Sequence, residues 1–371
     1  TERLIHSSAD VVVSYPLHDR ERPLRPSPLI KPYLKASDNV RIERFPVYSK
    51  LIFDSRRFEY KDDKNAPPIP TGQHVSGGTG LFKDQAACAF RAFARHRLHA
   101  RGLIKTDIGL NAMERGSLLH DVMQHFWRKI NNHSALVALT EKQQDALIDN
   151  TINTAIMAYK KQRPRTFTDR FTALEKQRLK ILVLDWLAIE KQRQNFRVVA
   201  CEESHNFNFA DIEVHTRIDR IDEMGDGRFI IVDYKTGDVS ISAWFDERPD
   251  DPQLPLYAIT SDGNIAALVF AKVRHGDSRF IGVSDGEGIL PAVKSFVKTK
   301  YANELENWDD LLTNWKRVLL RLGNEFRQGK AEVNPKNEYT CRYCDLHALC
   351  RIHELTHTGT DDVSNVDQNN E

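Results

Sequence analysis

The feature that most constrains the fold is a pair of β-like segments, 212–222 and 229–235, on either side of the sequence Gly225-Asp226-Gly227. The first segment alternates apolar and polar residues, and the second opens with four consecutive apolar residues. A glycine-containing turn between two such runs predicts a β-hairpin. If the turn is three residues long, the register places Asp219 directly opposite Asp233.

This hairpin would bring acidic side chains together. Residues two apart on a strand share a face, so Asp233 and Lys235 project together. Side chains at facing positions lie roughly 5 Å apart, and two carboxylates at that distance repel each other unless a cation lies between them. Mg²⁺ or Mn²⁺ prefers such oxygen ligands, and the Lys235 ammonium would assist a metal-activated water at a phosphate. Asp-x-Lys also occurs on ordinary surface hairpins, so the pattern needs further support.

The chain length and charge set broad limits. A length of 371 residues predicts roughly two domains, or one core with large helical additions. The net charge of +1 gives no case for nucleic-acid binding, so a DNA channel would need a local basic lining. The basic cluster Arg91, Arg95, Arg97 and Arg101 is interpreted as a solvated helix face.

No apolar run approaches the roughly 20 residues needed to cross a membrane, and the first residues show no signal pattern. We therefore expect a cytoplasmic protein without membrane contact. Because the chain does not begin with Met, we also expect it to be a piece of a longer protein.

Periodicity predicts a helical half followed by a mixed one. Helices are expected near 81–101, 112–130, 140–162 and 169–194, strands from Phe196 onward, a short helix near Pro252, a buried strand over 265–273 and a long helix over 304–328. Residues 1–60 form an upstream region, 61–80 a Pro- and Gly-rich linker, 81–356 the main domain and 357–371 a disordered tail.

Three of the five cysteines, Cys341, Cys344 and Cys350, lie within ten residues. Without a secretory signal, this spacing indicates a metal or cluster site rather than a disulfide framework. A fourth ligand must come from elsewhere. Zinc would accept a fourth sulfur or a histidine such as His347 or His353, and a [4Fe–4S] cluster would take four thiolates.

Several motifs resemble the RecB/AddB branch of the PD-(D/E)XK nuclease superfamily. The resemblance covers about residues 80–352 and rests on four segments: Arg115–His120, Ile218–Asp222, Asp233–Gly237 and Gln253–Ala258. It implies an α/β fold with a restriction-endonuclease-like mixed central sheet flanked by helices.

The resemblance also implies roles for single residues. His120, Asp219 and Asp233 would be metal ligands, Tyr234 would add its backbone carbonyl, and Lys235 would be the catalytic lysine.

Two further residues of this motif set, Gln253 and Tyr257, lie one helical turn apart and would face the active site or the DNA strand. One departure is Thr216, which stands three residues before the first Asp, where the family usually has Gly.

AddB-type nuclease domains have one cysteine ahead of the nuclease core and three behind it, which bind a [4Fe–4S] cluster. The upstream candidate is Cys88, in a segment that resembles the family's Cys-Pro-Phe with Ala89 in place of Pro. Such a cluster would act as a structural staple between the two ends of the domain, with structural Zn²⁺ as the alternative. Cys201 is expected to be an ordinary small residue in a strand.

The segment from Val13 to Leu29 resembles the stretch that joins the helicase-like portion of AddB-type proteins to their nuclease domain. No phosphate-binding loop is present, so we predict no motor activity. The resulting hypothesis is a Mg²⁺- or Mn²⁺-dependent deoxyribonuclease, an exonuclease on single-stranded DNA, in a helicase–nuclease type of DNA repair protein with a partner subunit. The alternative is a DNA-binding or scaffold module with a vestigial nuclease site.

Overall fold

The structure is a computed structural model that describes residues 2–9, 11–34, 48–55, 57, 64–70, 73, 75, 78–102, 109–261, 263–303 and 305–353. It divides into two compact units, Thr1–Lys61 and Asp62–Glu371. The predicted tail at 357–371 lies outside the described residues, as does much of the predicted linker at 61–80. No helix among the described residues is long and apolar enough to cross a membrane.

The described residues of the first unit contain little regular structure. Its elements are α1 (Glu2–Ile5), β1 (His18–Asp19), β2 (Arg22–Pro23), the 3₁₀ helix η1 (Lys31–Tyr33) and α2 (Tyr48–Asp54). The two short strands pair in antiparallel fashion. None of its described residues is buried, so this unit contains no hydrophobic core of its own among them.

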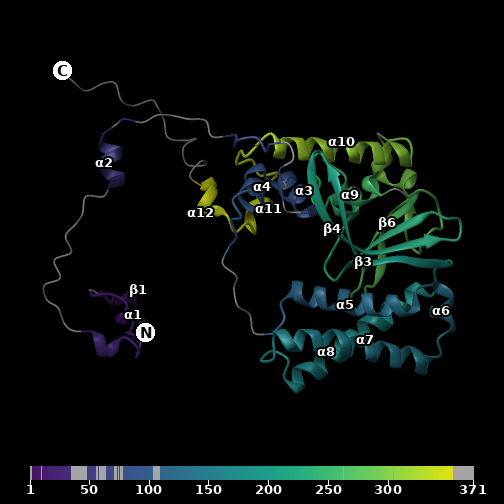
Figure 1. Cartoon of the computed structure of the whole chain (residues 1–371), viewed down its shortest axis with the longest axis horizontal. Helices are drawn as coiled ribbons and strands as arrows, with labels where there is room; N and C mark the ends of the chain where they lie inside the picture. The colour runs from purple at the N-terminus through teal and green to yellow at the C-terminus, as the bar shows by residue number, and fades with distance from the viewer. Residues whose placement is uncertain are drawn as a thin grey trace. The chain divides into compact units, whose positions relative to one another are not determined.

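The second unit is built on a six-stranded sheet, with its strands side by side in chain order (Figure 1). The strands are β3 (Phe196–Phe209), β4 (Ile212–Met224), β5 (Phe229–Lys235), β6 (Ile265–Lys272), β7 (Arg279–Ser284) and β8 (Lys294–Ser295). Strands β5 and β6 run parallel, as do β7 and β8, and the other neighbours are antiparallel. The mixed sheet confirms the predicted α/β architecture.

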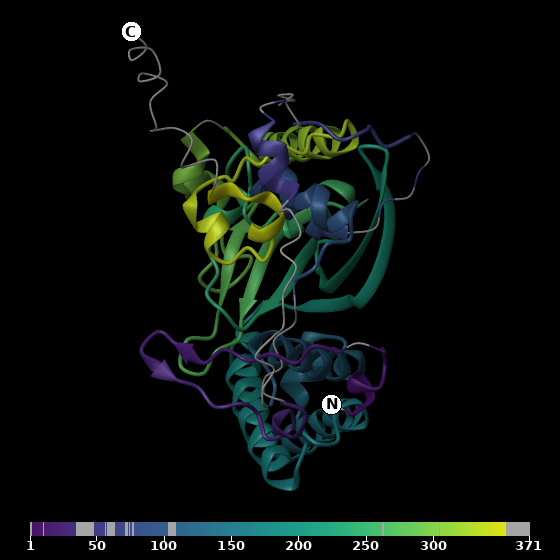
Figure 2. The same ribbon diagram turned by 90° about the vertical axis from the view of Figure 1, so that its left-hand side faces the viewer.

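Helices cover both faces of this sheet (Figures 1 and 2). On one face lie α5 (Ala112–Ile130), α6 (His133–Ala138), α7 (Glu141–Gln162) and α8 (Asp169–Glu190). The other face carries α3 (Gly78–Ala87), α4 (Ala89–His96), α9 (Gln253–Thr260) and α10 (Trp308–Arg327). The remaining helical segments are η2 (Ile241–Trp244), η3 (Phe296–Lys298), η4 (Lys300–Asn303), α11 (Glu338–Arg342) and α12 (His347–Cys350).

The long helices begin where polar capping residues predict. Asn111 and Thr140 each form a reciprocal capping box, with Glu114 and Gln143 respectively, which satisfies backbone groups at the start of α5 and α7. The predicted helices at 112–130 and 140–162 are therefore confirmed within a residue, and that at 169–194 ends four residues early, at Glu190.

The predicted helix at 81–101 is instead two helices, and that prediction was wrong in this respect. Cys88 has an extended backbone (φ −167°, ψ 123°) and precedes the first turn of α4. Neighbouring backbone groups bond to a distant segment, Lys336 N to Ala87 O (2.8 Å) and Phe90 N to Glu332 O (3.0 Å). These long-range hydrogen bonds stabilise the extended backbone at Cys88, which therefore lies at the junction between α3 and α4.

Part of the predicted linker is attached to the end of α10. Ala66 N donates to Gly329 O (2.7 Å) and Ile69 N to Arg327 O (2.8 Å). Gly329 has φ +87°, and a Cβ there would lie 2.0 Å from Ala66 O, so the close approach requires glycine. Residues 64–70 thus form an ordered contact with the domain.

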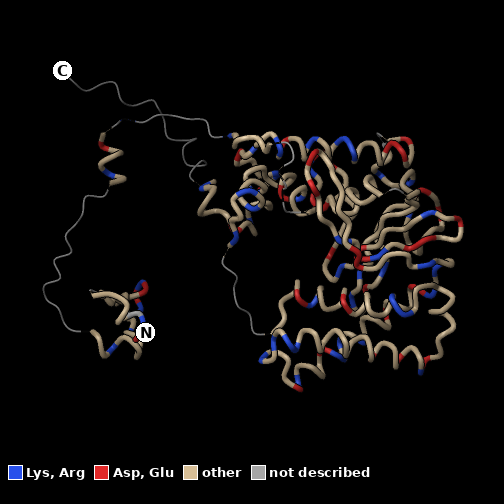
Figure 3. The backbone as a smooth tube through the Cα atoms, viewed as in Figure 1, with Lys and Arg blue, Asp and Glu red and all other residues tan. Residues whose placement is uncertain are grey.

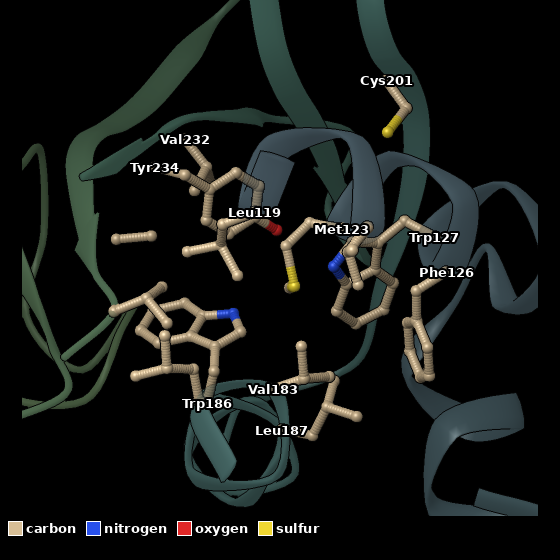
Figure 4. Packing of buried hydrophobic residues seen from close by; sticks show 14 of the residues in the cluster. Leu119, Met123, Phe126, Trp127, Val183, Trp186, Leu187, Cys201, Val232 and Tyr234 are labelled. Carbon is tan, nitrogen blue, oxygen red and sulfur yellow. The ribbon is translucent and has the colours of Figure 1, made fainter. Parts of the chain in front are cut away.

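The main core packs α5 and α8 against β5 (Figure 4). Leu119, Met123 and Trp127 from α5 meet Val183, Trp186 and Leu187 from α8 below Val232 and Tyr234. Strand β6, between β5 and β7, is buried at every position, as expected for a strand covered on both faces.

A buried ion network lies within this core. Arg220 Nη2 is 2.8 Å from Glu190 Oε1 and 2.9 Å from Asp222 Oδ2. Arg193 Nη1 contacts the same two acids at 2.7 Å each, and Trp186 Nε1 donates to Glu190 Oε1 (2.9 Å). All four charged side chains are at most 2% exposed. The two positive and two negative charges balance, which makes their burial tolerable.

We predict that Glu190→Ala lowers the free energy of unfolding by about 3–5 kcal/mol, because it leaves two buried guanidinium groups with a single shared acid, Asp222, and thus with one uncompensated buried charge. Urea denaturation measures the change. Glu287→Ala, which removes an exposed ion pair with Lys298, is the matched control and should cost no more than about 1 kcal/mol. Equal effects of the two substitutions would contradict this account.

Candidate metal centre

The β4–β5 hairpin has the predicted register. Arg220 pairs with Val232 and Ile221 with Ile231, and Met224 N donates to Arg228 O (2.8 Å) around the three-residue turn Gly225–Gly227. The ladder ends at Arg220 and Val232, and the next positions along the two strands are Asp219 and Asp233, which are close enough for their charges to interact. Asp219 Oδ2 also accepts a 2.7 Å hydrogen bond from Tyr234 N.

Both carboxyl groups are buried, with Asp219 6% and Asp233 2% exposed. Burial and the charge of Asp219 raise the pKa of Asp233 to about 7, against the opposing effect of Lys235. Lys235 Nζ lies 2.7 Å from Asp233 Oδ2. The two acids thus interact strongly, and an added cation would favour the ionised form of Asp233.

His120 reaches this pair from α5. Its Nδ1 lies 3.2 Å from Asp219 Oδ2 and its Nε2 lies 2.9 Å from Tyr234 O. Burial lowers the pKa of His120, but hydrogen bonds to Asp219 and Glu202 and the charge of Asp233 outweigh it and raise this pKa to about 10. The predicted ligands His120 and Asp219 and the carbonyl of Tyr234 are therefore direct neighbours.

Sequence reasoning missed a third acidic residue, Glu202 of β3. The pairs Cys201–Arg220 and Glu203–Ile218 place it across from Asp219. Its Oε1 lies 3.4 Å from His120 Nδ1, its side chain is 5% exposed, and it also pairs with Arg217. Glu202 has φ +54°, a left-handed backbone that is uncommon outside glycine and that clusters at functional sites.

The ligand atoms of His120, Glu202 and Asp219 all lie within 4.8 Å of one another. In the described parts of the chain, they are the one group of three or more His, Cys, Asp or Glu residues that meets this spacing. Two carboxylates, an imidazole and the nearby carbonyl of Tyr234 suit a hard divalent ion. Asp233, paired with Lys235, lies beside this group.

Gln253 and Tyr257 on α9 lie on the other side of β4. Gln253 Nε2 donates to the Tyr257 hydroxyl (3.3 Å), which donates to Arg217 O (2.7 Å). Burial raises the pKa of Tyr257, as do the charges of Asp233 and Asp219. The side chains of both α9 residues are thus held close to the acidic pair.

Cys341 lies near the other three cysteines of the predicted cluster. Burial raises the pKa of Cys341, and so do the charges of the Cys344, Cys88 and Cys350 thiolates, in that order. Cys201 lies apart from them in the main core, where burial raises its pKa to about 12. It fits the predicted role of a small buried strand residue.

The interpretation of the basic cluster as a solvated helix face was wrong for two arginines. Arg91 Nε donates to Asp84 Oδ1 (2.6 Å), and Arg95 bridges Asp84 (3.1 Å) and Asp345 (2.6 Å). Asp345 Oδ2 also accepts from Gly102 N (2.8 Å). Because Asp345 follows Cys344 directly, this ion network attaches the cysteine segment to α3 and α4.

Charged residues of both signs are interspersed over the domain (Figure 3). This agrees with the net charge of +1.

Comparisons with known proteins match a family model and eleven chains of solved structures. The family model for the PD-(D/E)XK nuclease superfamily matches residues 82–351. A solved structure described as "Crystal structure of SSO0001" is 13% identical, covers 73% of this chain and 94% of its own, and has a TM-score of 0.28. Such a score supports no argument. The comparison with curated proteins found no match.

The family match spans α5 with His120, the β4–β5 hairpin with its acidic pair and Lys235, and the C-terminal cysteine segment up to Arg351. The fold and the convergence of these side chains agree with it. The chain belongs to the PD-(D/E)XK nuclease superfamily.

Proposed function

We propose that the chain is a Mg²⁺- or Mn²⁺-dependent deoxyribonuclease that acts as an exonuclease on single-stranded DNA. The observation that carries the proposal is the convergence of His120, Glu202 and Asp219 beside the Asp233–Lys235 pair. Nucleases of this superfamily use divalent metals, and the donor set fits such an ion because it consists of carboxylates, an imidazole and a backbone carbonyl.

The side chains have distinct roles in this proposal. His120, Glu202, Asp219 and Asp233 would hold the ion, which when bound polarises a phosphoryl oxygen and lowers the pKa of water. Lys235 stays protonated. Burial lowers the pKa of Lys235, but the charge of Asp233 outweighs this effect and raises that pKa above its usual value. Its ammonium, 2.7 Å from Asp233 Oδ2, would position the attacking water and stabilise negative charge at the phosphate.

The biological setting is also part of the proposal. The resemblance of the motifs to the RecB/AddB branch supports a DNA repair protein of the helicase–nuclease type with a partner subunit. Free cysteines agree with a location in the reducing cytoplasm. The rival function is a DNA-binding scaffold with a vestigial site; degradation of single-stranded DNA by the native protein in Mn²⁺ would exclude it.

We further propose that Cys88, Cys341, Cys344 and Cys350 hold a [4Fe–4S] cluster. The resemblance to AddB-type nuclease domains, with one cysteine ahead of the nuclease core and three behind it, favours this cluster over structural zinc, the alternative. The cluster would join the α3–α4 junction to the C-terminal segment.

We predict that Asp233→Ala abolishes cleavage of single-stranded DNA and leaves the fold intact, because it removes a metal ligand together with a buried charge repelled by Asp219. Activity in Mn²⁺ and the urea midpoint are both measured. Asp149→Ala, on the exposed surface of α7, is the control and should keep full activity. Undiminished cleavage by Asp233→Ala would count against the site.

We predict that Glu202→Gln weakens Mn²⁺ binding at least about tenfold, since a ligand charge is lost beside His120 and Asp219. Isothermal titration of the metal-free protein with Mn²⁺ measures this. The neighbouring exposed Glu203 provides the matched control, and Glu203→Gln should bind Mn²⁺ like the native chain. If both variants keep native affinity, Glu202 is not a ligand.

We predict that Cys344→Ser lowers both the bound iron and the thermal stability of anaerobically prepared protein, because the staple is lost. Visible charge-transfer absorbance and iron content are measured. Cys201→Ser, a buried cysteine outside the group, should retain the colour. A colourless native protein that contains zinc would instead support the zinc alternative.

A further inference from the structure

A pocket of about 540 Å³ lies between the β3–β4 hairpin and α9. Its walls include three aromatic rings, those of Phe207, Phe229 and Tyr257, together with Ile218 and Ile221. The volume is in the range of sites that hold small organic groups. No Asp, Glu, Lys or Arg is among the described residues that line it, so its interior suits an uncharged group.

The pocket lies near the candidate metal centre, and Tyr257 connects the two. Tyr257 lines it and donates to the backbone of Arg217 (2.7 Å), two residues before Asp219. Thr216 also lines it and is 7% exposed. The charges of Asp233 and Asp219 act on the Tyr257 hydroxyl. A group in the pocket would therefore lie next to whatever the metal centre binds.

One polar atom of the pocket has no hydrogen-bond partner. His205 Nε2 is buried without a hydrogen-bond partner, and a buried polar group in that state is costly. Asn206 and Thr260 add polar side chains to the lining. Aromatic walls with a few hydrogen-bonding groups are what a nucleobase requires, because every base has π-faces and a polar edge.

We infer that this pocket holds an unpaired nucleobase of the strand whose phosphate lies at the metal centre. The inference rests on the proposed function and extends it, because it identifies the substrate feature that the site recognises beyond the phosphate. A base in a duplex is stacked and paired and cannot enter, so the pocket favours single strands. The charged backbone stays outside, where Lys235 and the metal ligands lie.

Filling the pocket tests the inference. Thr260 lines it, and its hydroxyl donates to Leu256 O one helical turn earlier (2.7 Å). Thr154 on α7 makes the same bond to Asn150 O (2.9 Å) but is exposed and away from the pocket. Thr260→Phe and Thr154→Phe therefore remove the same kind of hydrogen bond and add the same side chain, but only Thr260→Phe adds it inside the pocket. His205→Ala provides a second pocket variant that does not add bulk.

Binding is measured by fluorescence anisotropy on the full chain carrying Lys235→Ala, so that the strand is not cut. The probes are a 12-nucleotide thymidine oligonucleotide and an abasic strand of equal length. The parent should bind the thymidine strand roughly tenfold more tightly than the abasic one, as base stacking predicts. Thr260→Phe should remove that preference, His205→Ala should reduce it and Thr154→Phe should keep it.

Equal binding of the two strands by the parent, or a preference unchanged by Thr260→Phe and His205→Ala, would overturn the inference. The inference would also be overturned if Thr260→Phe abolished self-association of the chain and left DNA binding unchanged. That result would assign the pocket to a protein partner. The nuclease proposal is tested separately on the chain with Lys235 intact: no cutting in Mn²⁺, with base preference preserved, would refute the nuclease proposal and leave the pocket assignment standing.

Discussion

The repulsion between two buried carboxyl groups underlies the account of this site. Asp219 and Asp233 occupy the positions that follow the paired part of β4 and β5, and burial together with the charge of Asp219 raises the pKa of Asp233 to about 7. A fold that served stability alone would gain by replacing such a pair with apolar residues. A divalent cation at this point would turn the unfavourable contact into a binding site, and the nearby His120 and Glu202 complete the set of donors.

The core behind the site fixes its geometry. The ring hydroxyl of Tyr234 accepts from Arg220 Nη1 (2.7 Å), and Arg220 belongs to the buried network with Glu190. The backbone of the same Tyr234 contacts both Asp219 and His120. Packing of α5 and α8 against β5 thus determines where the candidate ligands lie, and a change in the network should be felt at the metal centre.

Much of this could be predicted from the sequence because it depends on local signals. Gly225-Asp226-Gly227 set the turn length and hence the register of the acidic pair, and apolar periodicity located the helices at 112–130 and 140–162. Glu202 could not be found in this way, because it reaches the site from a third strand through a left-handed backbone that no local pattern of residues announces.

The break at Cys88 and the pairing of Arg95 with Asp345 were missed for a related reason. Apolar periodicity continues through Cys88, and the groups that interrupt the helix come from residues near 332–336. Likewise, the partner of Arg95 lies 250 positions away. Contacts of this range are decided by the tertiary fold, so a basic stretch of helix looks the same in the sequence whether it faces solvent or an acidic segment.

The most direct test of the central claim is anomalous diffraction from crystals of the native chain soaked in Mn²⁺. The account predicts an anomalous peak within coordination distance of His120, Glu202 and Asp219, with Asp233 at its border. Well-diffracting soaked crystals with no manganese at these residues, or with these side chains turned away from one another, would contradict it.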